Sequence, residues 1–312
     1  MRTKILVLLL LSLYSLTSYS QWTNTRIEEQ TSPKNDIRTI CFDPSGNMFV
    51  ATANGIYKQQ NEEWIADSPE GIYIESFNID YQGLKRAGVW GGGIYKAEPN
   101  QNWNKDEKVS ISMSANVICN DQNGNTWIGT WDKGLIKADI VGDTSVYNTQ
   151  NALLGDNSVL SIATNNNTLW VGTYHGVSCL NNENWTLYNR DNSPLPNNDI
   201  YSLMVDNDGI VWVGTCSGLV KFDGNKWTSY NTQNSDIPSN IILSLAIDEA
   251  NVLWVGTPKG LVAKSKDNMQ LYNTANSNLM SNRIQTITIK DSKLYVGTNL
   301  GLSVADISAF DL

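Results

Sequence analysis

One short phrase recurs along the chain and constrains its fold more than any other feature. In its clearest form it reads Trp-Val-Gly-Thr, two variable residues, then glycine and an aliphatic residue. Exact, looser and degenerate copies lie at 50–56, 87–94, 127–135, 170–177, 212–219, 254–261 and 295–302. The closing glycines are Gly55, Gly93, Gly134, Gly176, Gly218, Gly260 and Gly301. Because successive glycines are 38 to 42 residues apart, the chain must be built from seven similar units.

Each unit reads as four short strands, and the copy that begins at Asn198 shows them most clearly. Its apolar and β-branched segments are 200–205, 210–215, 219–222 and 227–230. Turn residues rich in Asp, Asn and Gly separate them, and no window shows a sustained helical period. Four antiparallel strands in about 42 residues are typical of a propeller blade. We therefore predict an all-β, seven-bladed β-propeller with almost no helix.

The order of the outer strands predicts how the ring closes. Fourth strands are expected to start at Trp22, Trp64, Trp103, Thr144, Trp185, Trp227 and Met269. The first of these precedes the first complete set, whereas the last set, 284–304, has no clear outer strand after it. We expect the N-terminal strand, 22–25, to close the last blade and so remove an exposed sheet edge. Residues 21–312 are then expected to form one propeller domain.

Three recurring residue types have predicted structural roles. One tryptophan series is expected to pack between adjacent blades, and comprises Trp127, Trp170, Trp212 and Trp254. The outer-strand tryptophans are expected to cover blade edges. A series of asparagines before the first strands is expected to bond the loop backbone, and comprises Asn157, Asn198, Asn240 and Asn282. The repeated glycines are expected to permit a positive φ or a close backbone approach.

The first 20 residues have the pattern of a secretory signal peptide. Arg2 and Lys4 precede an apolar run over 5–13, and small residues lead to an expected cleavage near Ser20 and Gln21. The run is shorter than the ~20 residues that span a bilayer, so we expect no membrane span in the mature chain. Without Arg2 and Lys4, 20 basic residues oppose 31 acidic ones, a formal charge of −11. Such a chain is expected to be periplasmic or secreted, and it is a poor candidate for binding nucleic acid.

The cysteines do not suggest a metal site. Cys41, Cys119, Cys179 and Cys216 include no Cys-x-x-Cys pair, and no cofactor motif is present. We expect buried free thiols, with one disulfide as the alternative.

The whole repeat is similar to a known one. Asn-Asp-Ile-x-Ser-Leu, Asp-x-x-Gly and Trp-Val-Gly-Thr-x-x-Gly-Leu, in that order, resemble the two-component regulator propeller repeat. That repeat forms the periplasmic sensor half of hybrid histidine kinases in polysaccharide-degrading bacteria. The resemblance implies a sensor-type seven-bladed propeller, here free-standing. The blade count also resembles that of the streptogramin lyases, which use a histidine base with a divalent metal.

Function is expected where the copies differ, at the two variable positions of the phrase. These second-to-third-strand turns should share one face with the loops that enter each first strand. The candidate ligand-binding residues there are Trp90, Trp131, Asp132, Lys133, Tyr174, His175 and Lys259. Aromatic rings beside polar groups suit a sugar, because apolar ring faces stack while polar groups hold hydroxyls. Alternatively, these aromatic residues only cover the blade ends.

Three functions remain open from the sequence. The first is a non-catalytic binding module for a carbohydrate fragment or an envelope protein, with no catalytic residue. The second is a lyase or hydrolase of the streptogramin-lyase type that uses His175. The third is a scaffold subunit of a secretion or surface complex.

Overall fold

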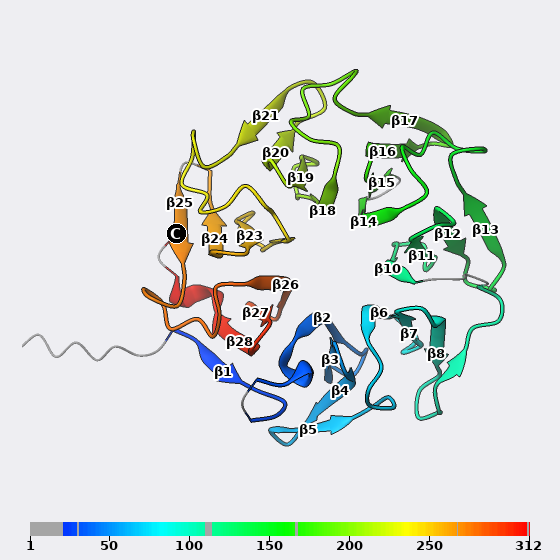
Figure 1. The fold of residues 1–312 in the computed structure, drawn as a ribbon, viewed down its shortest axis with the longest axis vertical. Helices are drawn as coiled ribbons and strands as arrows, with labels where there is room; N and C mark the ends of the chain where they lie inside the picture. The colour runs from blue at the N-terminus through cyan, green and yellow to red at the C-terminus, as the bar shows by residue number, and fades with distance from the viewer. Residues whose placement is uncertain (1–20, 30, 110–113, 166–167, 267, 311) are drawn as a thin grey trace, which may run out of the picture.

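The chain folds into a ring of seven four-stranded antiparallel sheets (Figure 1). The computed structural model describes residues 21–29, 31–109, 114–165, 168–266, 268–310 and 312. The signal peptide expected over 1–20 lies outside the described residues. In six of the sheets the strands follow chain order from the centre of the ring to its rim, and in the seventh the outermost strand is the first strand of the described chain. The predicted seven-bladed propeller is confirmed.

The blades are numbered here along the chain. Their strands are as follows: blade 1, β2 (Ile37–Phe42), β3 (Met48–Thr52), β4 (Gly55–Gln60), β5 (Glu63–Ala66); blade 2, β6 (Ile74–Ile79), β7 (Lys85–Val89), β8 (Gly93–Ala97), β9 (Asn104–Lys105); blade 3, β10 (Ala115–Asn120), β11 (Thr126–Thr130), β12 (Leu135–Ala138), β13 (Thr144–Tyr147); blade 4, β14 (Val159–Asn165), β15 (Thr168–Thr173), β16 (Gly176–Asn181), β17 (Asn184–Tyr188); blade 5, β18 (Ile200–Val205), β19 (Val211–Thr215), β20 (Gly218–Phe222), β21 (Trp227–Tyr230); blade 6, β22 (Ser244–Ile247), β23 (Leu253–Thr257), β24 (Gly260–Lys264), β25 (Met269–Tyr272); blade 7, β26 (Ile284–Lys290), β27 (Lys293–Thr298), β28 (Gly301–Asp306) and β1 (Thr23–Thr25).

The two ends of the chain meet in blade 7. Strand β1 pairs antiparallel with β28, with Thr23 opposite Val304 and Thr25 opposite Leu302. Trp22 is only 3% exposed, and its ring lies 5.4 Å from that of Phe310, centroid to centroid. The N-terminal strand therefore closes the last blade, as predicted, and covers the edge that β28 would otherwise present.

The recurring glycines have two different tasks, which blade 5 illustrates. A Cβ on Gly214 would meet Ser202 Oγ of its own blade and, at 2.8 Å, Ile242 Cγ2 of blade 6. Gly214 is thus required because neighbouring blades approach closely there. Gly218 instead adopts a φ of +125°, a conformation that residues with a Cβ rarely adopt. Thr215 Oγ1 closes the turn between them by donating to the Gly218 carbonyl at 2.8 Å.

The asparagine series anchors the loops that lead into the first strands. The side-chain oxygens of Asn157, Asn198, Asn240 and Asn282 each accept a backbone N–H eight residues upstream, at 2.8 to 2.9 Å. This prediction is confirmed, and it explains why Asn recurs at the same place in four successive blades.

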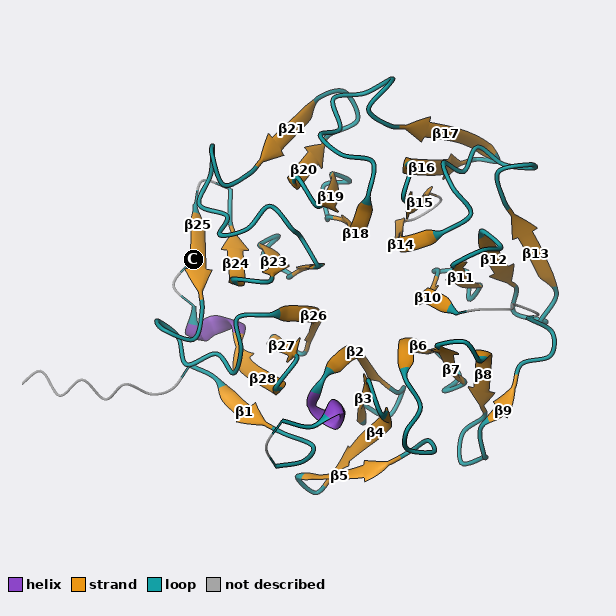
Figure 2. Ribbon diagram, viewed as in Figure 1, coloured by secondary structure: helices purple, strands orange, loops and turns teal. Residues whose placement is uncertain are grey.

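Helix is nearly absent from the described residues (Figure 2). Two 3₁₀ turns, η1 (Pro33–Asn35) and η2 (Ile307–Ala309), are its whole extent there, and no described helix could span a bilayer. The four cysteines are free. Burial raises the pKa of Cys41 and Cys119 to about 12, so both stay protonated near neutral pH. Cys179 is buried as a whole residue, whereas Cys41, Cys119 and Cys216 are half-buried, so only Cys179 fully meets the expectation of a buried thiol.

Candidate functional site

The variable turns and the entering loops share one face of the ring, as expected. Trp90 N donates to the Tyr73 carbonyl at 3.1 Å, and Trp131 N donates to the Ser114 carbonyl at 3.2 Å. In each pair, the first residue lies in a second-to-third-strand turn and the second directly precedes a first strand. We call this side the mouth face and the side with the other two hairpin turns of each blade the far face.

Four aromatic side chains form a continuous row on the mouth face. The ring centroids of Tyr73 and Trp90 are 6.3 Å apart, those of Trp90 and Trp131 are 6.1 Å apart, and those of Trp131 and Tyr174 are 6.1 Å apart. The Arg38 guanidinium extends the row into blade 1, 5.2 Å from the centre of the Tyr73 ring. This aromatic row, Tyr73 to Tyr174, crosses blades 2, 3 and 4. It joins three of the predicted site residues and adds one that the sequence analysis missed.

The rings are inclined to each other and differ in exposure. Interplanar angles along the row are 69°, 90° and 34°. Trp90 is 54% exposed, whereas Trp131 and Tyr174 are half-buried. The rings of the row therefore do not lie in one plane, and Trp90 is the most exposed of the three.

Polar groups flank the Tyr174 end of the row. The side chain of His175 is 67% exposed, and its Nδ1 lies 3.6 Å from Asp156 Oδ2. Burial raises the pKa of Tyr174, and the carboxylates of Asp199 and Asp156 raise it further. The Tyr174 hydroxyl therefore keeps its proton at neutral pH and can donate a hydrogen bond.

The remaining predicted residues lie on the same face but not all close together. Asp132 is half-buried and Lys133 is exposed, in the same turn as Trp131. Lys259 is exposed in blade 6, two blades beyond Tyr174. The structure thus brings Trp90, Trp131 and Tyr174 into contact and leaves Lys259 apart from them.

A second set of residues near the mouth face was missed by sequence reasoning. In six blades the first strand contains a β-bulge directly after its first residue. The bulge residues, which have no ladder partner, are Arg38, Glu75, Asn116, Leu160, Tyr201 and Gln285. All are half-buried on the innermost strands of the ring. Bulges commonly re-aim side chains near functional sites.

The bulge residues of neighbouring blades are linked by hydrogen bonds and charge. Arg38 Nη2 lies 2.8 Å from Asp36 Oδ2, and Gln285 Nε2 of blade 7 donates to Asp36 Oδ1. Burial raises the pKa of Glu75, and the nearby Arg38 guanidinium offsets part of that rise. Bulge residues of blades 7, 1, 2 and 3 are polar, whereas that of blade 4 is Leu160. These residues occupy the variable position x of the Asn-Asp-Ile-x-Ser-Leu segment, so the difference between copies is visible in the sequence, but nothing in the sequence marks the bulge itself.

The described residues offer hydrogen-bonding and stacking groups rather than clustered metal ligands. No group of three or more His, Cys, Asp or Glu side chains in the described part could hold a metal ion. His175 has Asp156 as its nearest acidic partner. The arrangement can stack on a ring-shaped ligand and hold its hydroxyl groups.

Comparison with solved structures shows the same fold in proteins of low sequence identity. The extracellular domain of a putative hybrid two-component system from B. thetaiotaomicron superposes with a TM-score of 0.79 at 21% identity, over 93% of this chain and 42% of that one. PorZ, described as a surface component of the type-IX secretion system of Porphyromonas gingivalis, superposes with a TM-score of 0.66 at 19% identity, over 87% of this chain and 46% of that one. Virginiamycin B lyase from Staphylococcus aureus gives 0.73 at 11% identity, over 91% and 98%. The chain thus spans less than half the length of the first two.

Sequence comparison gives a more restricted result. No curated protein matches the chain. The family model described as "Two component regulator propeller" matches residues 194–217 and 236–259. Each match runs from the loop before a first strand to the second-to-third-strand turn of blade 5 or blade 6. The resemblance seen in the sequence is therefore confirmed, and the chain is a seven-bladed propeller in which segments of blades 5 and 6 match the two-component regulator propeller repeat.

Proposed function

We propose that this protein is a non-catalytic binding module that holds a carbohydrate fragment against the aromatic row of its mouth face. The observation that carries the proposal is the unbroken contact of Tyr73, Trp90, Trp131 and Tyr174 across three blades. Structural repeats of a propeller need no such row, since blades 5 and 6 have Cys216-Ser217 and Pro258-Lys259 at the same turns. A feature confined to one arc of the ring is better explained by a ligand than by the fold.

The chemistry of the row suits a sugar. Exposed indole and phenol faces stack on the apolar faces of pyranose rings, while nearby polar groups bond hydroxyls. Asp132, Lys133 and His175 supply such polar groups beside the rings. A predicted signal peptide and an acidic mature chain favour a periplasmic or secreted protein, where carbohydrate fragments of cell envelopes are accessible.

A binding role also fits His175 better than a catalytic one does. Its side chain is largely exposed to solvent, with a single carboxylate 3.6 Å away. A general base works best where its geometry and pKa are constrained by several neighbours. The lyase hypothesis is nevertheless directly testable, because it predicts turnover that depends on this one histidine.

The experiment is a thermal-shift screen of the purified protein against a panel of oligosaccharides, followed by calorimetric titration of any that raise Tm. A bound ligand stabilises the native state by RT ln(1 + [L]/Kd). Trp90→Ala should weaken binding at least about tenfold, because an exposed stacking surface is lost. Tyr81→Ala removes an exposed aromatic side chain on the far face and is the matched control, with unchanged affinity expected.

Three outcomes would contradict the proposal. Equal affinity of Trp90→Ala and the unmodified protein would show that the aromatic row is not the site. Product formation that His175→Ala abolishes would show that the protein is a lyase or hydrolase. If a co-purifying envelope protein binds and no sugar shifts Tm, the carbohydrate assignment is wrong and the row is a protein-binding surface.

A further inference from the structure

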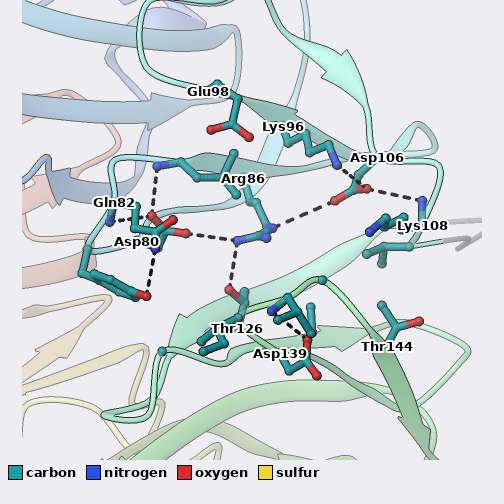
Figure 3. Close-up of a pocket in the computed structure, with 18 residues that line it drawn as sticks. Asp80, Gln82, Arg86, Lys96, Glu98, Asp106, Lys108, Thr126, Asp139 and Thr144 are labelled. Carbon is teal, nitrogen blue, oxygen red and sulfur yellow. Dashed lines mark hydrogen bonds and ion pairs between the residues drawn. The ribbon is translucent and has the colours of Figure 1, made fainter.

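Blades 2 and 3 enclose a cavity on the far face, away from the aromatic row (Figure 3). Its volume is about 210 Å³, and Arg86, Lys96 and Asp106 of blade 2 lie along it with Thr126 of blade 3. Small-molecule sites usually have roughly 300–1,000 Å³. This cavity therefore has room for a single chemical group, such as one inserted side chain.

The cavity exists because blade 2 departs from the repeat. In the β-ladder Arg86 pairs with Asn78 and Lys96, just as Trp127 pairs with Cys119 and Lys137 in the next blade. Arg86 thus takes the position of the interblade tryptophan. A charged network replaces the indole, and it leaves space between the blades.

Hydrogen bonds and ion pairs involve only some of the charged side chains that line the cavity. Arg86 Nη1 donates to Thr126 Oγ1 at 2.9 Å and lies 3.6 Å from Asp80 Oδ2. Lys96 Nζ lies 3.0 Å from Asp106 Oδ1. Arg86 Nε is buried and forms no hydrogen bond in the described part of the chain, but it faces Asp106 Oδ2 at 4.0 Å. Arg86 thus has a carboxylate on each side, Asp80 and Asp106, and only its bond to Thr126 has ordinary hydrogen-bond geometry.

Unpaired charges of both signs lie at the cavity entrance. Lys108, Glu98 and Asp139 form no ion pair with any described residue, but the Asp139 carboxylate accepts the backbone N–H groups of Val141 and Asp143. In Figure 3 the two side chains lie on opposite sides of the Lys96–Asp106 pair. Lys108 and Glu98 are therefore the cation and the anion of the cavity lining whose charged groups have neither an ion pair nor a hydrogen bond among the described residues.

An apolar rim adjoins these charges. Tyr81, Ile140 and Val141 are 61%, 64% and 72% exposed, the three highest values among large apolar side chains in the described residues. Ile140 and Val141 form the tip of the β12–β13 turn, whereas the corresponding tips are Asn182-Glu183 in blade 4 and Gly224-Asn225 in blade 5. Clustered exposed apolar side chains of this kind mark interaction surfaces.

We propose that this surface, the cavity with its rim of Tyr81, Ile140 and Val141, binds a second copy of the same chain across a twofold axis. A twofold contact places each patch against itself, so it requires a patch that complements itself. Lys108 of one copy would pair with Glu98 of the other, twice per dimer, and the apolar rims would bury each other. A strongly acidic or strongly basic partner would instead meet repulsion from one of these two charges.

Sedimentation velocity of the purified protein over a wide concentration range tests the proposal. The protein should convert from monomer to dimer as its concentration rises. The double variant Ile140→Asn, Val141→Asn, which restores a polar turn tip, should raise the dimer Kd at least about tenfold. Leu153→Asn, which removes an exposed apolar side chain from the β13–β14 loop, is the control and should leave Kd unchanged.

A charge exchange tests the pairing itself. Lys108→Glu and Glu98→Lys should each weaken the dimer, because like charges then face each other twice. An equimolar mixture of the two variants should restore it as a heterodimer. A protein that stays monomeric at every concentration, or a dimer that tolerates the polar turn tip, would overturn the proposal. A mixture no tighter than either variant alone would overturn the assigned charge pair.

Discussion

Trp254 donates its indole N–H to Asp248 Oδ2 at 3.0 Å, and neither side chain is accessible to solvent to any useful extent. The same bond joins Trp127 to Asp121 and Trp212 to Asp206, at 2.9 Å in each case. The aspartate also caps the hairpin turn, since Asp248 Oδ1 accepts the Val252 N–H at 2.8 Å. One repeated pair therefore fixes the turn on the far face and orients the ring that packs between blades.

Replacing the Trp254 indole by a smaller ring should lower the stability of the fold. Trp254→Phe leaves a carboxylate oxygen buried without its donor and a small void beside it. We expect it to lower the free energy of unfolding by about 3 kcal/mol. Trp227→Phe is the matched control, because Trp227 is half-buried and stacks on Phe222 at 4.2 Å, a contact that phenylalanine can keep. Urea denaturation of both variants checks this, and equal losses would refute a special role for the Trp–Asp bond.

Ring closure through Trp22 predicts a second stability effect. Trp22→Ala removes a side chain that is 3% exposed and that packs on Phe310. Its cost should be about 3–5 kcal/mol, as for other buried tryptophans. Trp90→Ala, at a position 54% exposed, should cost about 0.5 kcal/mol or less. Thermal unfolding separates the two, and a Trp22→Ala protein as stable as Trp90→Ala would show that closure contributes little.

The close approach of blades 5 and 6 predicts coupling between two positions. Gly214→Ala places a methyl group against Ser202 Oγ and Ile242, and should cost about 1–3 kcal/mol by overpacking. Ser202 Oγ is buried without a hydrogen-bond partner in the described chain, so Ser202→Ala alone should be nearly neutral. In the double variant the added methyl gains space, so the loss should be smaller than the sum of the single losses. Strict additivity in a double-mutant cycle would show that the glycine is needed for another reason.

The repeat made the architecture predictable, because seven glycines at a nearly constant spacing leave little freedom in the number of sheets. The offset of Trp22 likewise predicted closure, since one outer strand preceded its blade. The candidate site was predictable only in part. Trp90, Trp131 and Tyr174 stood out as differences between copies. Tyr73 did not, because it lies in the loop that enters blade 2 and not in the variable phrase. The cavity beside Arg86 depends on which side chains of blade 3 face the position where blade 2 has arginine and not tryptophan. A repeat alignment does not show those contacts between blades.

The bulge residue Glu75 predicts a pH dependence of stability. Burial raises the pKa of Glu75 in the folded protein above its ordinary value of 4.5, with Arg38 offsetting part of the rise. The folded state then binds the proton more tightly than the unfolded chain, so this group favours folding most at low pH. Its contribution falls as pH rises through 4.5 toward the folded pKa, and above that value the ionised carboxylate is a net cost. Glu75→Gln removes this titration and should gain stability relative to the unmodified protein as pH increases across that window.

Tm measured at a series of pH values for both proteins checks the sign of this pH dependence. A difference in Tm that is constant with pH, or that favours the unmodified protein at higher pH, would show that Arg38 outweighs burial at this position.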